Sequence, residues 1–282
     1  MSTSKQSLSN PEKSTRLLAA DLGLSRWSYV LLSTFVLTLF VLGYVWWPLA
    51  EEYLAQIDWS RPLWQQVDWL LIGIFAVMTI LIMTGANLKV DLLIVSVGLV
   101  GGLVIESWGT QTELWTYYTL ERPPLWIIPA WPIAALSIDR LVRILHRVSP
   151  DAPSEGHAFS GIYTLLYWLI FPAFMLLMLV FVWPTLDKSF TILALTLCTL
   201  MILTPTDYRL SVLTFIAGSG LGYFLELWGT TRLCWSYYTL QTPPLFAVLA
   251  HGIAAVAFWR AGLIVLQIKR AVVNTALQFT QK

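Results

Sequence analysis

Long apolar runs, separated by short polar segments, occupy most of the chain after residue 26. A helix needs about 20 residues to cross the hydrocarbon core of a bilayer, and most of these runs approach that length. The segments between them are too short to form a soluble domain. We therefore predict an all-α polytopic membrane protein with about eight transmembrane helices, over residues 27–49, 69–84, 92–108, 125–138, 162–183, 190–203, 210–228 and 245–268.

Basic residues are distributed unevenly over the connecting segments. With the N-terminus in the cytoplasm, 13 of the 17 Lys and Arg residues fall on the cytoplasmic side, and Arg61, Arg122, Lys188 and Arg232 fall outside. This bias follows the positive-inside rule. We predict a multi-pass protein of the cell inner (cytoplasmic) membrane with both termini in the cytoplasm. Most of the 15 tryptophans then lie near the outer face, more than an aromatic belt requires.

The composition excludes several classes of protein. With 57% hydrophobic and 12% charged residues, the chain is not that of a soluble domain. A net charge of +1 without a basic cluster argues against nucleic acid as a partner, because phosphate binding needs clustered Lys and Arg. Cys198 and Cys234 have no metal-ligand spacing, so we expect neither a metal site nor a cofactor.

The chain contains an internal repeat with an offset of 120 residues. Residues 106–125 align with residues 226–245, and 12 of the 20 aligned positions are identical. Four spans in each half would give two parallel repeats, and sites in such proteins tend to lie between the halves. The expected organisation is a cytoplasmic tail (1–26), a first four-helix repeat (27–147), a cytoplasmic linker (148–160), a second repeat (161–270) and a C-terminal cytoplasmic tail (271–282).

The best-matched segment carries candidate chemistry. Glu106 and Glu226 each end an apolar run near the outer interface, and a carboxylate facing lipid is costly, so each should face the bundle interior. Gly109 and Gly229 then suit a sharp turn or a helix stop. The Pro-Pro pairs that begin at positions 123 and 243 suit the first turn of the next helix.

Aromatic residues follow both acids at the same spacing. Their rings combine apolar area with a polar tip, as a lid over a lipid-binding site would need. We take Glu106 and Glu226 as candidate catalytic residues. The candidate substrate-binding residues are Trp108, Trp115, Tyr117, Tyr118, Trp228, Trp235, Tyr237 and Tyr238.

Two interpretations of these residues remain open. Two neighbouring buried carboxyl groups could supply a proton to an alkene, and aromatic faces could stabilise the resulting carbocation. Alternatively, each Glu cross-links neighbouring helices by accepting bonds from tyrosines or loop N–H groups, and the aromatic residues anchor the protein at the interface. His251, which is opposite Trp131 in the first half, suits either a structural hydrogen bond or a proton carrier.

Charged residues at the inner span ends receive a simpler interpretation. Arg140 and Arg260 share a repeat position, and we expect both to extend to inner headgroups. Lys89 and Asp91 are expected to mark the same interface.

The segment from Glu106 to Tyr118 loosely resembles the carotenoid hydratase group of integral membrane proteins, on its acidic residue followed by Gly, Thr, a Trp and a Tyr-Tyr pair. Paired intramembrane acids are also similar to those of membrane-bound terpene and lycopene cyclases. The resemblance implies Glu106 and Glu226 as acid groups and an isoprenoid substrate. The aromatic spacing and the strict doubling depart from the hydratase pattern, which leaves the reaction type open.

Three functions are compatible with these features. The first is an enzyme or binding protein for an isoprenoid, carotenoid-like or quinone-like lipid, with a site between the halves near the outer leaflet. The second is a non-catalytic membrane subunit that holds pigment, quinone or lipid and packs against other membrane-protein subunits through its tryptophan-rich surface. The third is a small transporter in which the two carboxylates carry protons or cations.

Overall fold

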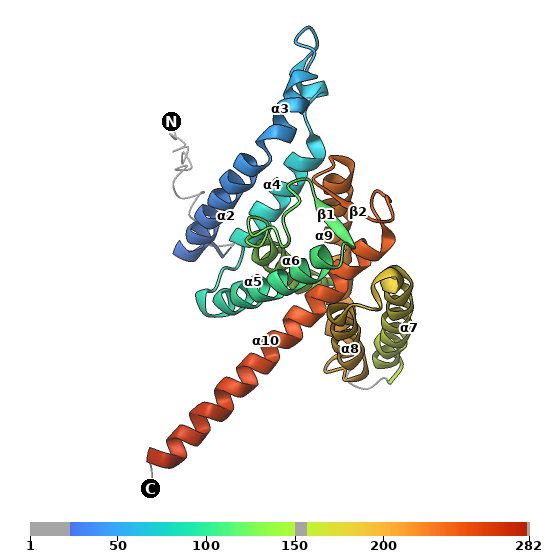
Figure 1. Ribbon diagram of the computed structural model, residues 1–282. Coiled ribbons are helices and arrows are strands. Elements are labelled where there is room, and N and C mark those ends of the chain that lie inside the picture. The colour runs from blue at the N-terminus through green and yellow to red at the C-terminus, as the bar shows by residue number, and fades with distance from the viewer. Residues whose placement is uncertain (1–22, 150–156, 281–282) are drawn as a thin grey trace, which may run out of the picture.

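The computed structural model describes residues 23–149 and 157–280. Helices dominate, and two three-residue strands form one small sheet (Figure 1). The elements are α2 (Arg26–Val45), α3 (Trp47–Ala55), α4 (Trp69–Met83), α5 (Leu88–Gln111), β1 (Trp115–Tyr117), α6 (Ala130–Val148), α7 (His157–Val182), α8 (Ser189–Leu203), α9 (Tyr208–Thr231), β2 (Trp235–Tyr237) and α10 (Leu245–Thr280), with single 3₁₀ turns at Leu63–Gln65 and Trp183–Thr185. The predicted N-terminal tail lies outside the described residues except for its last four.

Five of the described helices, α2, α5, α7, α9 and α10, are long and apolar enough to cross a membrane. The apolar helices α4 and α8 have 15 residues each and are shorter than a full span. Exposed apolar side chains cover much of the outside of these helices. In water such a surface would be unfavourable, so the chain has the character of a helical membrane protein.

Each predicted apolar run contains a helix, but several boundaries differ. The first run divides at Trp46 into α2 and α3, with Pro48 in the first turn of α3. The run at 125–138 becomes α6, which begins at Ala130 and continues to Val148. The second half ends in a single helix that reaches Thr280, so residues 271–280 continue α10 and do not form a separate tail.

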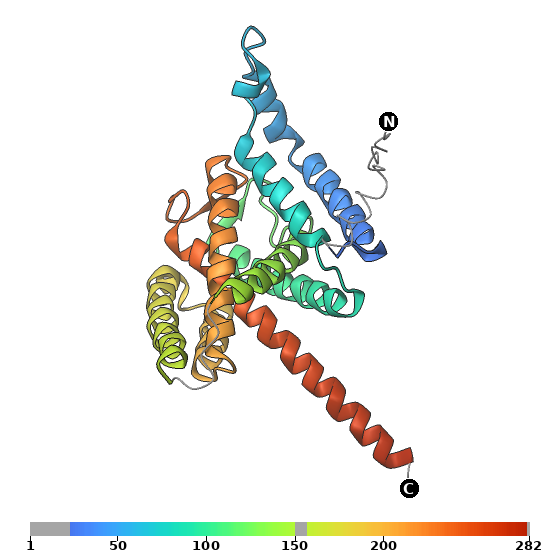
Figure 2. The same ribbon diagram turned by 180° about the vertical axis from the view of Figure 1, so that it is seen from behind.

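Four helices form the centre of the molecule. Helices α5, α6, α9 and the first half of α10 pack against one another, with α2 and α4 on one side and α7 and α8 on the other (Figures 1 and 2). The second half of α10 extends away from this bundle. The two strands lie near one end of the central helices.

Glycines allow the central helices to approach closely at equivalent places. A side chain at Gly102 of α5 would overlap Trp131 of α6, and one at Gly222 of α9 would overlap the imidazole of His251 in α10. Small residues permit such close helix contacts. The consequence is that residues 131 and 251 lie directly against the helices that carry Glu106 and Glu226.

A buried ion pair joins α5 and α6. Arg140 Nη2 lies 2.7 Å from Asp91 Oδ1, and the two side chains are only 3% and 4% exposed. Arg140 also pairs with Asp139 at 2.6 Å and donates from Nε to the carbonyl of Thr84. The expectation that Arg140 extends to headgroups and that Asp91 marks the interface was therefore wrong, because each charge is neutralised inside the protein.

Candidate functional site

The two strands bring the repeated motifs together. β1 and β2 pair antiparallel, with Trp115 opposite Tyr237, Thr116 opposite Ser236, and Tyr117 opposite Trp235. Thr116 and Ser236 have the same position in the repeat, so the pairing is centred on equivalent residues. The tryptophan of each motif consequently lies beside the tyrosine of the other, with ring centroids 5.9 Å apart in both pairs.

Glu106 is enclosed by three hydrogen-bond donors from its own half of the chain. Trp115 Nε1 donates to Oε2 (3.0 Å), Tyr117 Oη donates to Oε1 (2.9 Å), and Trp131 Nε1 donates to Oε1 (3.1 Å). The carboxylate is 3% exposed. Both oxygens of the carboxyl group therefore accept hydrogen bonds, as the oxygens of a carboxylate do.

Glu226 has the same surroundings with one difference. Trp235 Nε1 donates to Oε2 (2.9 Å) and Tyr237 Oη donates to Oε1 (2.8 Å). The third partner is His251, whose Nε2 lies 3.0 Å from Oε1, where the first half has an indole. Each glutamate thus lies in a cage of three side chains, Trp115, Tyr117 and Trp131 for Glu106 and Trp235, Tyr237 and His251 for Glu226. Only the cage of Glu226 contains an imidazole, which can accept as well as donate a hydrogen bond.

The phenols of Tyr117 and Tyr237 act as hydrogen-bond donors to the two glutamates. Burial, and next the charge of the neighbouring glutamate, raise the pKa of Tyr117 and Tyr237 well above the usual range of a phenol. Both therefore stay protonated at any physiological pH. Their protons remain available for the carboxylates.

Gly109 and Gly229 act differently from the prediction. Each lies inside a helix that continues two residues further, to Gln111 and Thr231. A side chain at either glycine would overlap the indole of the cage tryptophan, Trp115 or Trp235. The glycines therefore provide the space in which the indoles lie.

The turns that follow α5 and α9 are made by residues other than these glycines. Glu113 and Leu233 adopt left-handed backbone conformations, with φ of 62° and 56°. Neither proline pair lies in the first turn of a helix as expected, since Pro243 and Pro244 directly precede α10 and irregular turns separate the first pair from α6.

The remaining predicted residues lie around the cages. Trp108 and Trp228 line the adjoining cavity, and their indoles donate to Thr191 Oγ1 (3.3 Å) and Asp68 Oδ2 (2.9 Å). Tyr118 and Tyr238 do not touch the glutamates. They donate to the carbonyls of Val45 and Phe181, and so connect the two loops to the ends of α2 and α7.

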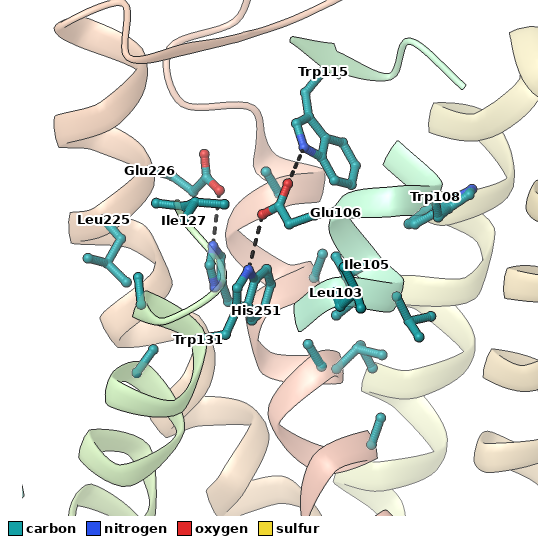
Figure 3. Close-up of a pocket in the computed structure, with 18 of the residues that line it drawn as sticks. Leu103, Ile105, Glu106, Trp108, Trp115, Ile127, Trp131, Leu225, Glu226 and His251 are labelled. Carbon is teal, nitrogen blue, oxygen red and sulfur yellow. Dashed lines mark hydrogen bonds and ion pairs between the residues drawn. The ribbon is translucent and has the colours of Figure 1, made fainter. Parts of the chain in front are cut away.

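A cavity of about 1080 Å³ adjoins both cages. Figure 3 shows Glu106 and Glu226 at it, with Trp115 and Trp131 bonded to the first and His251 to the second. Apolar side chains from α2, α4, α5, α8 and α10 form most of its wall. Ligand pockets commonly have volumes of about 300–1000 Å³, so this cavity is large enough for a sizeable apolar molecule.

One position of the site, shared by Trp131 and His251, contributes a bond to each glutamate, and the bond from Trp131 was not predicted. Trp131 and His251 are 120 residues apart and complete the two cages, but they lie beyond the identical block and differ in type. The repeat offset of 120 residues relates the two positions. It predicts that residues 131 and 251 occupy equivalent places in the fold although one is an indole and the other an imidazole.

No metal cluster accompanies the cages in the part of the chain that the structure describes, since no group of three or more His, Cys, Asp or Glu side chains could hold an ion. Comparisons with protein-family models, curated proteins and solved structures found no match to this chain. The case for a function therefore depends on the cages and the cavity.

Proposed function

We propose that this protein binds a long apolar lipid of the isoprenoid class, carotenoid-like or quinone-like, in the cavity beside Glu106 and Glu226. The observation that carries the proposal is the combination of a cavity of about 1080 Å³, an almost wholly apolar wall, and a polar end made by two caged carboxylates. Pockets of this composition take apolar ligands and orient them through a few polar groups.

The proposal includes a membrane arrangement. Eight helices would cross the inner membrane as two parallel repeats, with both termini in the cytoplasm and the cages near the outer leaflet. The positive-inside bias and the recurrence of the cage contacts after 120 residues support it. The shorter helices α4 and α8 would span with the help of their flanking turns.

A second candidate function is acid catalysis on the bound lipid, and the Glu226–His251 contact favours it. In this reaction the pair would transfer a proton to an alkene carbon, the π electrons forming the new C–H bond and leaving a carbocation on the neighbouring carbon. Water could add to the cation and return a proton to the pair. In a cyclisation, the π electrons of a second double bond would instead form the ring C–C bond, and the new cation would return a proton from the neighbouring carbon to the pair, leaving an alkene. The Glu106 carboxyl group and the aromatic rings around it would stabilise the cation.

The first experiment identifies what the cavity holds. The full chain is purified gently, and the lipids that remain bound are measured by mass spectrometry. Ala257 lines the cavity on α10, so Ala257→Trp fills it, whereas Ala271→Trp adds the same ring on an exposed part of the same helix. We expect an isoprenoid lipid with the parent protein and with Ala271→Trp, and its loss from folded Ala257→Trp.

Other outcomes favour the other functions. A stoichiometric set of protein partners without a bound lipid would favour the complex subunit. Lipid retained equally by both tryptophan variants would show that it binds elsewhere and would overturn the proposal. For catalysis, Glu226→Gln should abolish turnover of the bound lipid without releasing it, and unchanged turnover would exclude the acid role.

A further inference from the structure

The two halves of the protein differ at the inner end of the bundle. Arg140 is neutralised by Asp91 and Asp139, at 2.7 and 2.6 Å. Adding the repeat offset of 120 to these three positions gives Arg260, Ser211 and Trp259. The second half has therefore kept the cation and replaced both of its acidic partners by uncharged residues.

The contacts of Arg260 agree with this difference. Its guanidinium donates to the carbonyl of Met201 and, from Nη2, to Thr204 Oγ1 at 2.9 Å. Both acceptors are neutral, and Arg260 forms no ion pair with a carboxylate of the described residues. A guanidinium has five N–H donors, and these two bonds engage two of them. The side chain is partly buried, where an uncompensated charge is costly.

Arg260 also faces the large cavity. Of the described residues that line it, Arg260 is the one Lys or Arg, whereas each lining glutamate already has three partners. One face of α10, formed by His251, Ala254, Ala257 and Arg260, leads along the cavity. Arg260 lies nine positions after His251, which corresponds to about 13 Å along a helix.

The wall near Arg260 also reaches the apolar surface of the protein. Leu197 and Leu200 of α8 line the cavity and are each 54% exposed. They lie on the same helix as Met201, which accepts from Arg260. A lipid could therefore enter from the side, between apolar side chains, without crossing a polar surface.

We propose that Arg260 binds the anionic headgroup of the lipid, while the apolar tail extends through the cavity toward Glu106 and Glu226. This inference rests on the proposed function and narrows its ligand to an isoprenoid amphiphile that carries an oxyanion, a phosphate monoester above all. The planar guanidinium matches two oxygens of a phosphate. The caged glutamates disfavour an anion beside them. The headgroup therefore lies at Arg260 and the apolar tail at the cages.

The test measures binding of geranylgeranyl monophosphate and of geranylgeraniol to the full chain in phosphatidylcholine nanodiscs. The two probes share a tail and differ only in charge. We expect the phosphate to bind at least tenfold more tightly than the alcohol. Arg260→Gln should remove this preference and leave the affinity for the alcohol unchanged. Arg270→Gln, an exposed arginine further along α10, should change neither affinity.

A second variant tests the charge without removing the arginine. Ser211→Asp restores the acid that the first half has at position 91, and it should also reduce the preference for the phosphate at least tenfold. Thermal unfolding of each variant verifies that it is folded. Equal binding of phosphate and alcohol to the parent protein, or equal effects of Arg260→Gln and Arg270→Gln, would overturn the assignment.

Two further arms distinguish the source of the anion. Complete displacement of geranylgeranyl monophosphate by inorganic phosphate would indicate a site for the free ion and contradict the amphiphile. Displacement by phosphatidylglycerol in the nanodisc would indicate a bilayer headgroup and contradict the isoprenoid tail. Equal binding of the phosphate and the alcohol, abolished by Ala257→Trp and unchanged in Arg260→Gln, would refute this inference alone. Binding of neither probe would refute the proposed function.

Discussion

Trp131 and His251 stack on each other, with ring centroids 5.9 Å apart and planes inclined by 20°, and each contacts a different glutamate. They have the same position in the repeat. The stacked pair therefore links the two cages from one side, as the β1–β2 pairing does from the other. The difference between an indole and an imidazole also gives otherwise equal cages unequal chemistry, because an indole only donates a hydrogen bond whereas a neutral imidazole can also accept one.

This difference predicts unequal effects of removing the two charges. In Glu106→Gln, the new NH₂ group must face Trp115 or Trp131, whose indoles only donate, so one indole N–H loses its acceptor. In Glu226→Gln, the NH₂ group can take the place of Oε1 and donate to neutral His251. We expect Glu106→Gln to lower the free energy of unfolding by about 1–3 kcal/mol and Glu226→Gln by less than about 1 kcal/mol. Thermal unfolding followed by tryptophan fluorescence measures both, and equal losses would contradict the assigned partners.

Exchanging the third partner provides a second prediction. His251→Trp copies the cage of Glu106 and keeps an N–H donor for Glu226, whereas His251→Ala leaves that oxygen with one partner fewer and creates a void. The alanine variant should be less stable than the tryptophan variant by at least about 1 kcal/mol. Equal stability would mean that the donor at position 251 contributes little to the cage.

The glycines at the cages predict a steric effect. Alanine at Gly109 or Gly229 would overlap the indole of Trp115 or Trp235 and displace it from its glutamate. We expect each substitution to cost about 1–3 kcal/mol, as overpacking generally does. Gly73→Ala in α4 is the matched control, because no atom lies within 4 Å of the new methyl group and alanine favours a helix. A stable Gly109→Ala variant with an intact cage would show that the indole does not need this space.

The repeat and the hydropathy pattern predicted much of the architecture. Every apolar run contains a helix, and Glu106 and Glu226 do face the interior and accept bonds from the aromatic residues nine and eleven positions later. These features follow from local composition and from an offset that is visible in the letters. They required no knowledge of which helices are neighbours.

Features that depend on tertiary partners could not be predicted in this way. The run at 125–138 was predicted to end before Asp139 and Arg140, because a hydropathy pattern treats charged residues as solvated. Asp91 lies 49 positions away from Arg140 and neutralises it, so the helix continues inside the protein. The repeat pairs Trp131 with His251, but the bond from Trp131 to Glu106 was not predicted, since a position in the repeat does not show which helix a side chain faces.

The buried pair itself predicts a large loss on substitution. Asp91→Leu would leave Arg140 buried without its closest acceptor from α5, and breaking such a pair costs about 3–5 kcal/mol. The exposed pair between Arg61 and Asp58 is the control, since exposed pairs contribute about 0–1 kcal/mol. Chemical unfolding of Asp91→Leu and Asp58→Asn in the same detergent compares them. Similar small losses would show that Asp139 alone compensates Arg140.

The closure over the cages of the two loops that contain β1 and β2 can be tested through a thiol. Cys234 lies between α9 and β2, is 2% exposed, and accepts a backbone bond from Tyr118 of the other loop. Burial raises the pKa of its thiol to about 12, so the reactive thiolate is scarce at neutral pH. In a Cys198→Ser background we expect N-ethylmaleimide to leave Cys234 unmodified in the folded protein and to modify it after denaturation. Leu233→Cys combined with Cys234→Ser moves the thiol to a neighbour that is 64% exposed, and this thiol should react within minutes. Equal reactivity of the two positions would mean that the paired loops open in solution, which would also expose Tyr117 and Glu106 to water.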